Sequence, residues 1–447
     1  MSFLQIGFAR QDITAPLGVS IGGYYVPRRA DGILDRLYAN ALAFSDGETT
    51  TILFSLDQLS INTKQMDIYR GMIAKEAGIP YEAVFIACTH SHTTPLVKQK
   101  EGDSLYVDLL GRLLCDAAKM ALADLKPARL GIARSTASKV SFIRRFRMKD
   151  GSILTNPGVN NPNIVGPIST SDDMVQVVRI RREGGDDIAI VNFQVHPDTI
   201  GGCSFSADYP GFVRNTFENA VPGTKCIYFN GTAGDSNHVN VFPEAGDLND
   251  LVTDTFDDVA RGYEHSRHMG LAIAGAAMQV YEKAAPVCGG KVHYMQQTVK
   301  VPSQKGDPSL IPEAKRIVEL HDSGRDNELP YRGMQLTTVV VEAHRMINLV
   351  DGPDFFELNI TGVSIGNVAF IGIPGEPFTD VGRSIKAQSP FAATIPCCLT
   401  NGSEGYYPMR SAYEEGGYEA RSSRFKPGVA EALIDSSVSI LKALHNE

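Results

Sequence analysis

Short apolar runs alternate with longer segments of helical period along most of the chain. The apolar runs are rich in Val, Ile and Phe and end at turn residues, a pattern that predicts buried β-strands. They are residues 51–56, 83–88, 175–180, 188–195 and 226–229. The segments of helical period predict α-helices. These are residues 64–76, 105–125, 212–220, 267–283 and 429–444.

This alternation predicts an α/β fold, with a layered mixed β-sheet core flanked by helices. No repeat or low-complexity tract divides the sequence, so we expect one large catalytic domain over residues 1–447. Residues 145–171, rich in Asn, Gly and Pro, and residues 242–264, rich in Asp, are expected to be ordered loops over a face of the sheet. Residues 303–332 predict a helix between polar ends. The strand-like run 336–344 follows, and the two together could be a small insertion.

Composition narrows the class of protein. The chain is 43% hydrophobic and 21% charged, as in ordinary globular proteins. A net charge of -9 without a basic stripe makes nucleic acid an unsuitable partner. The sequence has no run of about 20 apolar residues, so we expect no stable membrane insertion. The N-terminus shows no secretion signal, and seven cysteines without a CxxC pair are typical of reduced thiols, so we expect a cytoplasmic protein.

Polar residues follow two of the predicted strands directly. The run 83–88 leads into His90 and His92, whose side chains point to the same side of an extended chain. The run 188–195 leads to His196, with Asp198 close behind. Imidazole is a preferred zinc ligand when a carboxylate or carbonyl orients its second nitrogen, and Asp198 or Asp57 could do so. Each histidine alone is more often a structural hydrogen bonder, so the pattern favours a metal site without requiring one.

Other candidate sites are weaker. Glu376 follows the apolar run 368–373, but a carboxylate before a predicted helix commonly just complements the helix dipole. His265 and His268 lie three residues apart on a predicted helix, where a solvated or packed face is the better interpretation. The segment 231–235 lacks the Lys of a phosphate-binding loop.

Taken in order, several short blocks of the sequence resemble those of the neutral, non-lysosomal ceramidases. They include Ala-Arg-Gln-Asp-Ile-Thr-Ala-Pro at 9–16, Thr-His-Ser-His-Thr-Thr-Pro at 89–95 and Phe-Gln-Val-His-Pro at 193–197. Ser-Ala-Asp-Tyr-Pro-Gly at 206–211, Asn-Gly-Thr-Ala-Gly-Asp at 230–235 and Pro-Gly-Glu-Pro-Phe-Thr at 374–379 follow. The two tyrosines of the family, twelve residues apart, are matched by Tyr406 and Tyr418. The resemblance extends over nearly the whole chain.

The resemblance implies one catalytic zinc ion and a division of roles among these residues. The implied zinc ligands are His90, His196, Glu376 and Tyr406. Zinc held by two imidazoles and two oxygen donors keeps a position for water, whose pKa falls to about 7. Three further residues are implied around the oxyanion of an amide-hydrolysis intermediate: His92, Tyr418 and Arg144, with Arg145 as the alternative to Arg144. His92 could also pass a proton to the leaving amine.

The sequence also departs from the family. Asn237 stands where the family carries a Ser, and Ser236 precedes it, so we expect water rather than a hydroxyl group as the nucleophile. Family members commonly have a C-terminal β-sandwich domain and are secreted or face a membrane. We expect neither here. Charged residues in the two expected loops predict that the mouth of the cavity is polar. In the first loop they are Arg144, Arg145, Arg147, Lys149 and Asp150, and in the second they are Asp247, Asp250, Asp254, Asp257 and Asp258.

The sequence therefore predicts a zinc-dependent amidohydrolase that acts on linear amides, with a small soluble amide as the substrate rather than ceramide. Two alternatives remain open at this point. A zinc esterase or lactonase would use the same hydroxide and the same oxyanion donors. A non-catalytic binding protein could retain the metal pocket, although such a protein has no need of the complete ligand set.

Overall fold

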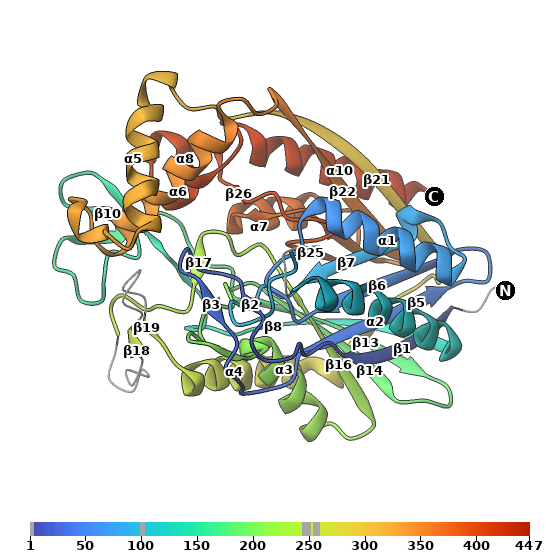
Figure 1. Cartoon of the computed structure of the whole chain (residues 1–447). Helices are drawn as coiled ribbons and strands as arrows, with labels where there is room; N and C mark the ends of the chain where they lie inside the picture. Colours follow the sequence, from blue (N-terminus) through green and yellow to red (C-terminus); the bar gives the residue numbers. More distant parts are fainter. Residues whose placement is uncertain (1–3, 99–102, 244–251, 254–259) are drawn as a thin grey trace.

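A nine-stranded mixed β-sheet lies at the centre of the computed structural model, which describes residues 4–98, 103–243, 252–253 and 260–447 (Figure 1). Eight of its strands follow one another, and β20 (Ala285–Pro286) pairs with β8 beside them. The order is β16 (Thr224–Asn230), β14 (Asp187–Phe193), β13 (Met174–Arg182), β8 (Lys126–Thr136), β1 (Gln5–Asp12), β5 (Tyr38–Ser45), β6 (Thr50–Leu56) and β7 (Val84–Cys88). Only the outermost pairs, β14–β16 and β6–β7, are parallel.

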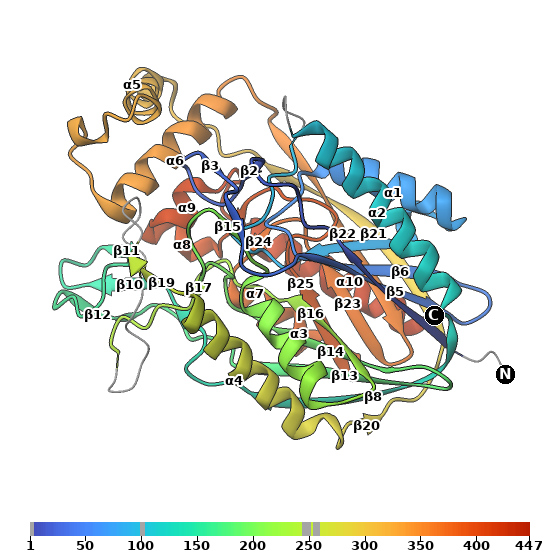
Figure 2. The ribbon, with the colours of Figure 1, turned by 60° about the horizontal axis from the view of Figure 1, so that its bottom comes forward.

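The two faces of the large sheet are covered differently. Helices α1 (Thr63–Ala77) and α2 (Ser104–Ala123) cover the β1–β7 half of one face, and α3 (Asp208–Ala220) and α4 (Tyr263–Tyr281) cover the β13–β16 half (Figure 2). Because strand side chains alternate, Phe54 packs under the helices while Leu53 faces the opposite core. The five predicted strands and five predicted helices all form, within a few residues of their expected ends.

The opposite face packs on a second, four-stranded sheet, in the order β21 (Val292–Pro302), β22 (Phe355–Ile365), β23 (Val368–Gly372) and β25 (Ala393–Cys397). Phe85 and Phe229 from the large sheet share one core with Phe370 from the small sheet. Helices α7 (Thr379–Gln388) and α10 (Val429–Asn446) cover the outer face of the small sheet. The result is a four-layer α/β architecture, which confirms the predicted fold class (Figure 1).

The outer strands of the large sheet approach each other where they end. The Asn230 side-chain amide, at the end of β16, donates to the Thr89 carbonyl just after β7, over 3.2 Å. Another bond in the same place joins the backbone amide of Cys398, after β25, to the Asn230 carbonyl over 3.2 Å. The polar residues that follow β7, β14 and β16 are thereby brought to one place, although they are far apart in the sequence.

The segment expected to contain a strand at 336–344 is helical, so that prediction is wrong. It lies within α6 (Gly333–Leu349), which packs against α5 (Ile311–Asp322), the helix predicted within 303–332. Val339 and Val340 belong to the same hydrophobic cluster as Leu320, whereas Val341 belongs to another cluster together with Tyr406. Because both sides of the helix are buried, its β-branched run has no amphipathic period and resembles a strand.

The loop expected over residues 145–171 is instead a small antiparallel sheet. Its strands β10 (Arg145–Met148), β11 (Ile153–Thr155) and β12 (Ile164–Pro167) are only three or four residues long, and Asn, Gly and Pro turns conceal them in the sequence. Phe146, Met148, Ile164 and Val241 form a separate small core beneath it. Most of the second expected loop, 242–264, lies outside the described residues, including all five of its aspartates at 247, 250, 254, 257 and 258. In the described parts of the chain, no helix combines the length and apolarity needed to cross a bilayer.

Candidate metal centre

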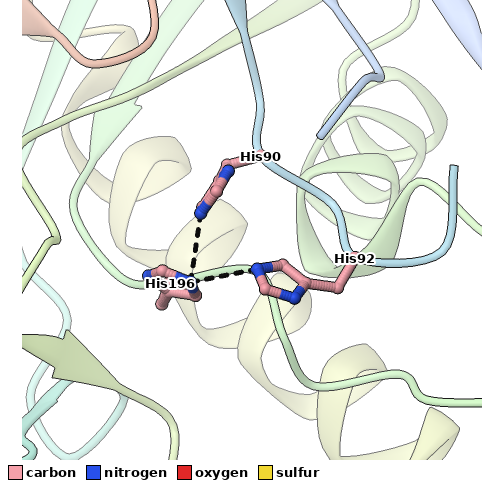
Figure 3. Close-up of side chains that lie close together, drawn as sticks. All are labelled: His90, His92 and His196. Carbon is pink, nitrogen blue, oxygen red and sulfur yellow. Dashed lines mark hydrogen bonds between the residues drawn. The ribbon is translucent and has the colours of Figure 1, made fainter. Parts of the chain in front are cut away.

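Three buried histidines face one another beyond the ends of β7 and β14 (Figure 3). The Nε2 atom of His196 lies 3.1 Å from Nε2 of His90 and 3.0 Å from Nε2 of His92. His90 has a backbone φ of 79°, in the left-handed region that non-glycine residues rarely adopt. Such a conformation turns the chain sharply after β7, and it is typical of positions where function demands an unfavourable geometry.

The hydrogen bond of His90 fixes which of its nitrogens faces the cluster. Nδ1 lies 2.9 Å from the Leu59 carbonyl and must donate to it, so in the neutral ring Nε2 carries a lone pair. That lone pair points at His196 Nε2, 3.1 Å away. Two imidazole nitrogens at this distance need a proton or a cation between them. The arrangement therefore suits a metal ion.

An oxygen ligand lies beside the histidines. Glu376 Oε2 is 3.2 Å from His90 Nε2, and among the described residues no donor makes a hydrogen bond of normal geometry to this buried oxygen. A buried carboxylate oxygen without a donor is costly unless a cation compensates it. The donor set of imidazole nitrogens and a carboxylate is one that zinc binds readily, so the residues present fit the predicted metal.

A short parallel strand pair places Glu376 and Tyr406 next to each other. β24 (Glu376–Pro377) pairs with β26 (Tyr406–Tyr407), and Glu376 is the direct backbone partner of Tyr406. Behind this pair, a Cβ on Gly234 would lie 2.5 Å from the Glu376 carbonyl oxygen, so only glycine fits there. The four predicted ligands, distant in sequence, come from the segments that follow β7 and β14 and from the paired strands β24 and β26.

Arg144 connects Tyr406 to a buried carboxylate. Its Nη2 donates to the Tyr406 hydroxyl over 3.1 Å and to the Gly234 carbonyl over 2.7 Å, and its Nε donates to Glu419 over 2.7 Å. Burial lowers the pKa of Arg144. The nearby Tyr406 and Glu419 raise that pKa by more than burial lowers it, so the guanidinium stays charged. Arg145, the alternative from the sequence, turns away and donates to Glu415 and the Gly416 carbonyl.

The third predicted catalytic residue, Tyr418, begins helix α9 (Tyr418–Ser422) and packs edge-on against Tyr406 with their ring centres 5.5 Å apart. Its hydroxyl lies 3.5 Å from that of Tyr25. Burial raises the pKa of both the Tyr406 and Tyr418 phenols well above their usual value, so each keeps its proton at neutral pH in the protein alone. Tyr418 is therefore a hydrogen-bond donor at the edge of the cluster.

His92 has a charged partner on its other side. Its Nδ1 lies 3.5 Å from Asp198, which also accepts hydrogen bonds from Tyr24 over 2.6 Å and from Arg261 Nη2 over 2.7 Å. Burial tends to raise the pKa of Asp198, but Arg261 outweighs it and holds that pKa well below its usual value. Burial lowers the pKa of His92 to about 3 despite the nearby carboxylate. His92 is thus a neutral imidazole.

His196 is neutral as well. Burial lowers its pKa well below 6.5, and the neighbouring His90 and Arg144 lower it further. Glycine also shapes this side of the cluster, because a Cβ on Gly23, whose φ is 111°, would lie 2.9 Å from His92 Nδ1. Of the two carboxylates considered as orienting partners, Asp198 is at the site. Asp57 instead forms a buried ion pair with Arg214, over 2.6 and 2.8 Å.

A cavity of about 50 Å³ adjoins the cluster. Five of the seven predicted site residues line it, namely His92, His196, Arg144, Tyr406 and Tyr418. Sequence reasoning missed Tyr24, Tyr25, Asn156, Met334 and Thr337, which also line this cavity, and Glu419 behind it. Glu419 follows Tyr418 directly, and Gly22-Gly23-Tyr24-Tyr25 is a glycine turn before two aromatics. These were the only signals available.

Two residues weighed from the sequence lie elsewhere. His265 is half-buried on α4 and packs edge-on against His238 with ring centres 5.3 Å apart, and His268 is exposed. Neither belongs to a potential metal cluster among the described residues. Ser236 is buried, and its Oγ does not line the cavity beside the histidines.

The fold can be compared with known structures now that the site is described. Neither a protein-family model nor a curated protein matches the sequence. Solved structures do: a neutral ceramidase from Pseudomonas aeruginosa superposes with a TM-score of 0.73 at 17% identity, covering 100% of this chain and 75% of that one. The chain has the neutral ceramidase fold. A second solved structure, described as ceramidase complexed with C2, superposes on this chain with a TM-score of 0.72 at 17% identity. The match covers 100% of this chain and 76% of the other.

Proposed function

We propose that the protein is a zinc-dependent hydrolase that cleaves a carboxamide bond, with one metal ion per chain. The observation that carries the proposal is the convergence of His90 and His196 nitrogens on one point, beside a buried Glu376 oxygen that has no hydrogen-bond donor among the described residues. Tyr406 would complete the ligand set as the strand partner of Glu376. The ceramidase fold supports the assignment, because the solved structures that share it are described as ceramidases.

Zinc bound here would supply a nucleophilic hydroxide at neutral pH and a Lewis acid for the carbonyl oxygen. The remaining work falls to the chain's own residues. The Nε2 atom of His92 faces the cluster, 3.0 Å from His196 Nε2, and there it can accept a proton from the attacking water and return it to the leaving amine nitrogen. Asp198, held by Tyr24 and Arg261, places its negative charge 3.5 Å from His92 Nδ1 on the opposite side of the ring.

Charge develops on the carbonyl oxygen during attack and needs donors that are already in place. Tyr418 offers a hydroxyl proton at the edge of the cavity, and the Arg144 guanidinium beside Tyr406 supplies a fixed positive charge. Glu419 and the Gly234 carbonyl hold Arg144 on two sides, so its position requires no rearrangement during the reaction. Both residues act on the oxyanion.

Water, rather than a serine, is the proposed nucleophile. Ser236 is the only hydroxyl residue next to the position where Asn237 replaces the family's Ser, and its Oγ is buried away from the cavity. Asn237 is held by Asn156, to which its side-chain amide donates over 2.9 Å. An amide side chain has no nucleophilic oxygen of the required basicity.

The substrate is proposed to be a small soluble amide. The cavity at the cluster holds only about 50 Å³, and the larger space beside it has polar as well as apolar walls. Ceramide would require space for two long alkyl chains. We further propose a cytoplasmic location, in keeping with seven cysteines that all stay free.

The test is hydrolysis of short N-acyl amines by zinc-loaded protein, with the matched esters and long-chain ceramide in detergent assayed in parallel. We expect a higher kcat/KM for the short amides than for ceramide, and loss of activity with a chelator. Esters are intrinsically more reactive than amides. If each ester is hydrolysed faster than its matched amide by more than this intrinsic difference, the protein is an esterase instead. If ceramide is the best substrate, the small-amide assignment is wrong.

A further inference from the structure

A second cavity of about 450 Å³ opens next to the cluster cavity. The two cavities share three wall residues, Asn156, Met334 and Tyr418. A molecule whose reacting carbonyl lies at the histidines can therefore extend past Tyr418 into this space. At roughly 30 Å³ per water-sized group, the space accommodates about 15 such groups, a compact portion of a substrate.

The walls of this cavity come from three segments. The β11 strand and the turn after it supply residues 153–158, the start of α6 supplies Gly333, Met334 and Gln335, and α9 supplies Tyr418 and Arg421. Arg332, the residue before α6, completes the rim. The described wall residues include these two arginines and no Asp or Glu.

The charge of Arg332 is not balanced within the described structure. Its guanidinium donates to three backbone carbonyls, those of Leu329, Tyr331 and Asn327, and these neutral acceptors leave its charge uncompensated. The acidic residues of the preceding turn are already engaged, because Asp326 pairs with His321 over 2.9 Å and Glu328 with Arg325 over 3.6 Å. A guanidinium has five N–H donors, so Arg332 retains donors for a ligand.

A second excess of positive charge lies at the Arg421 end. Glu342 is the carboxylate partner of both Arg421, over 2.9 Å, and Arg345, over 3.6 Å. Burial lowers the pKa of Arg345, and the charge of Arg421 lowers it further, although Glu342 opposes both effects. One carboxylate thus serves two guanidiniums beside the cavity, and a third guanidinium, that of Arg332, has none.

We infer that this cavity binds the anionic end of the substrate, with Arg332 as the residue that selects it. The substrate class is then an N-acyl amide that carries a carboxylate or another oxyanion on the part lying beyond Tyr418. Arginine recognises such groups through paired N–H donors, whereas a neutral lipid headgroup offers nothing to balance the charge. The inference rests on the proposed hydrolase function and specifies its substrate.

The experiment uses zinc-loaded protein and two matched pairs of amides. N-hexanoylglycine is compared with N-hexanoylaminoethanol, which places the charge in the amine half. The N-hexyl monoamide of glutaric acid is compared with N-hexylpentanamide, which places it in the acyl half. In at least one pair, kcat/KM should be about tenfold or more higher for the anion, the size expected of a charged hydrogen bond.

Arg332→Gln should remove most of that preference by lowering kcat/KM for the anionic amide. Arg325→Gln is the matched control, because Arg325 is an exposed arginine of the same segment that does not line the cavity. The control should keep the full preference. Thermal unfolding of both variants establishes that the segment stays folded.

The outcomes separate the two proposals. If neutral amides are cleaved as well as the anions, or if Arg332→Gln keeps the preference, the anion-binding inference is wrong and the hydrolase function stands. If no amide is cleaved, the hydrolase function fails. In that case, calorimetric titration with the same four compounds tests the anion-binding inference separately. Tighter binding of an anion than of its neutral partner, lost in Arg332→Gln, supports the inference. Equal binding within each pair overturns it.

Discussion

Arg144 and Glu419 form a buried ion pair, with the Arg144 Nε donating to the carboxylate over 2.7 Å behind the metal-binding cluster. The Glu419 side chain is fully buried, and its second oxygen accepts a hydrogen bond from the Thr155 hydroxyl over 2.9 Å. The same guanidinium donates to Tyr406 over 3.1 Å. The pair therefore connects the second residue of the short helix α9 to a predicted metal ligand.

Removing the charge of Glu419 should destabilise the folded protein. Glu419→Gln is expected to lower the free energy of unfolding by about 3 kcal/mol, because it leaves the Arg144 charge buried without its partner. The control Glu415→Gln, which breaks a partly exposed pair with Arg145, should cost less than about 1 kcal/mol. Urea unfolding measures both. Equal losses would show that burial of the pair contributes nothing.

Arg144 and Arg145 offer a matched pair for testing the oxyanion role. Both are buried and both lie within ion-pair distance of Glu419, but only Arg144 contacts Tyr406. Arg144→Gln should lower kcat by about 100-fold, the usual cost of one oxyanion-stabilising group. Arg145→Gln should lower it far less. The idea fails if steady-state kinetics give the two variants the same kcat.

Metal content distinguishes ligands from catalytic neighbours. His90→Ala, His196→Ala and Glu376→Ala should each lower zinc occupancy, measured by elemental analysis of protein purified without chelator. Tyr406→Phe should lower it less, because a phenol with a raised pKa is the weakest of the four ligands. His92→Ala should retain more than half of the zinc yet lose activity. Loss of zinc from His92→Ala as complete as from His90→Ala would make His92 a ligand.

The choice of nucleophile is tested at Ser236. Ser236→Ala should keep activity within about twofold, since water reacts and the Ser236 hydroxyl is buried outside the cavity. Rapid quenching of the wild-type reaction followed by mass spectrometry should show no acyl adduct. An adduct on Ser236 would contradict a water nucleophile.

The elements that the sequence predicted are those with a strong local pattern. The buried strands β7 and β14 are mostly apolar runs, so the sequence could place the histidines after them at strand ends. Strands such as β5, rich in Ala, and β8, interrupted by Arg, lack such a run and were not identified. Their strand state depends on pairing with distant neighbours.

The site was predicted through family blocks rather than through periodicity. No local pattern shows that Glu376 and Tyr406 are strand partners, because each strand is two residues long. The resemblance indicated Arg144, with Arg145 as the alternative, and the structure shows that Arg144, just before β10, contacts Tyr406 whereas Arg145 contacts Glu415. The larger cavity depends on α6, whose helical state the sequence did not predict.

The central claim is that one zinc ion per chain, held at the histidine cluster, is required for amide hydrolysis. The most direct measurement is a titration of metal-free protein with zinc while hydrolysis of a short N-acyl amine is followed. We predict that activity rises linearly to one equivalent of zinc and then stays constant, and that His90→Ala stays inactive throughout. Full activity in the metal-free protein, or an equal response from His90→Ala, would contradict the account.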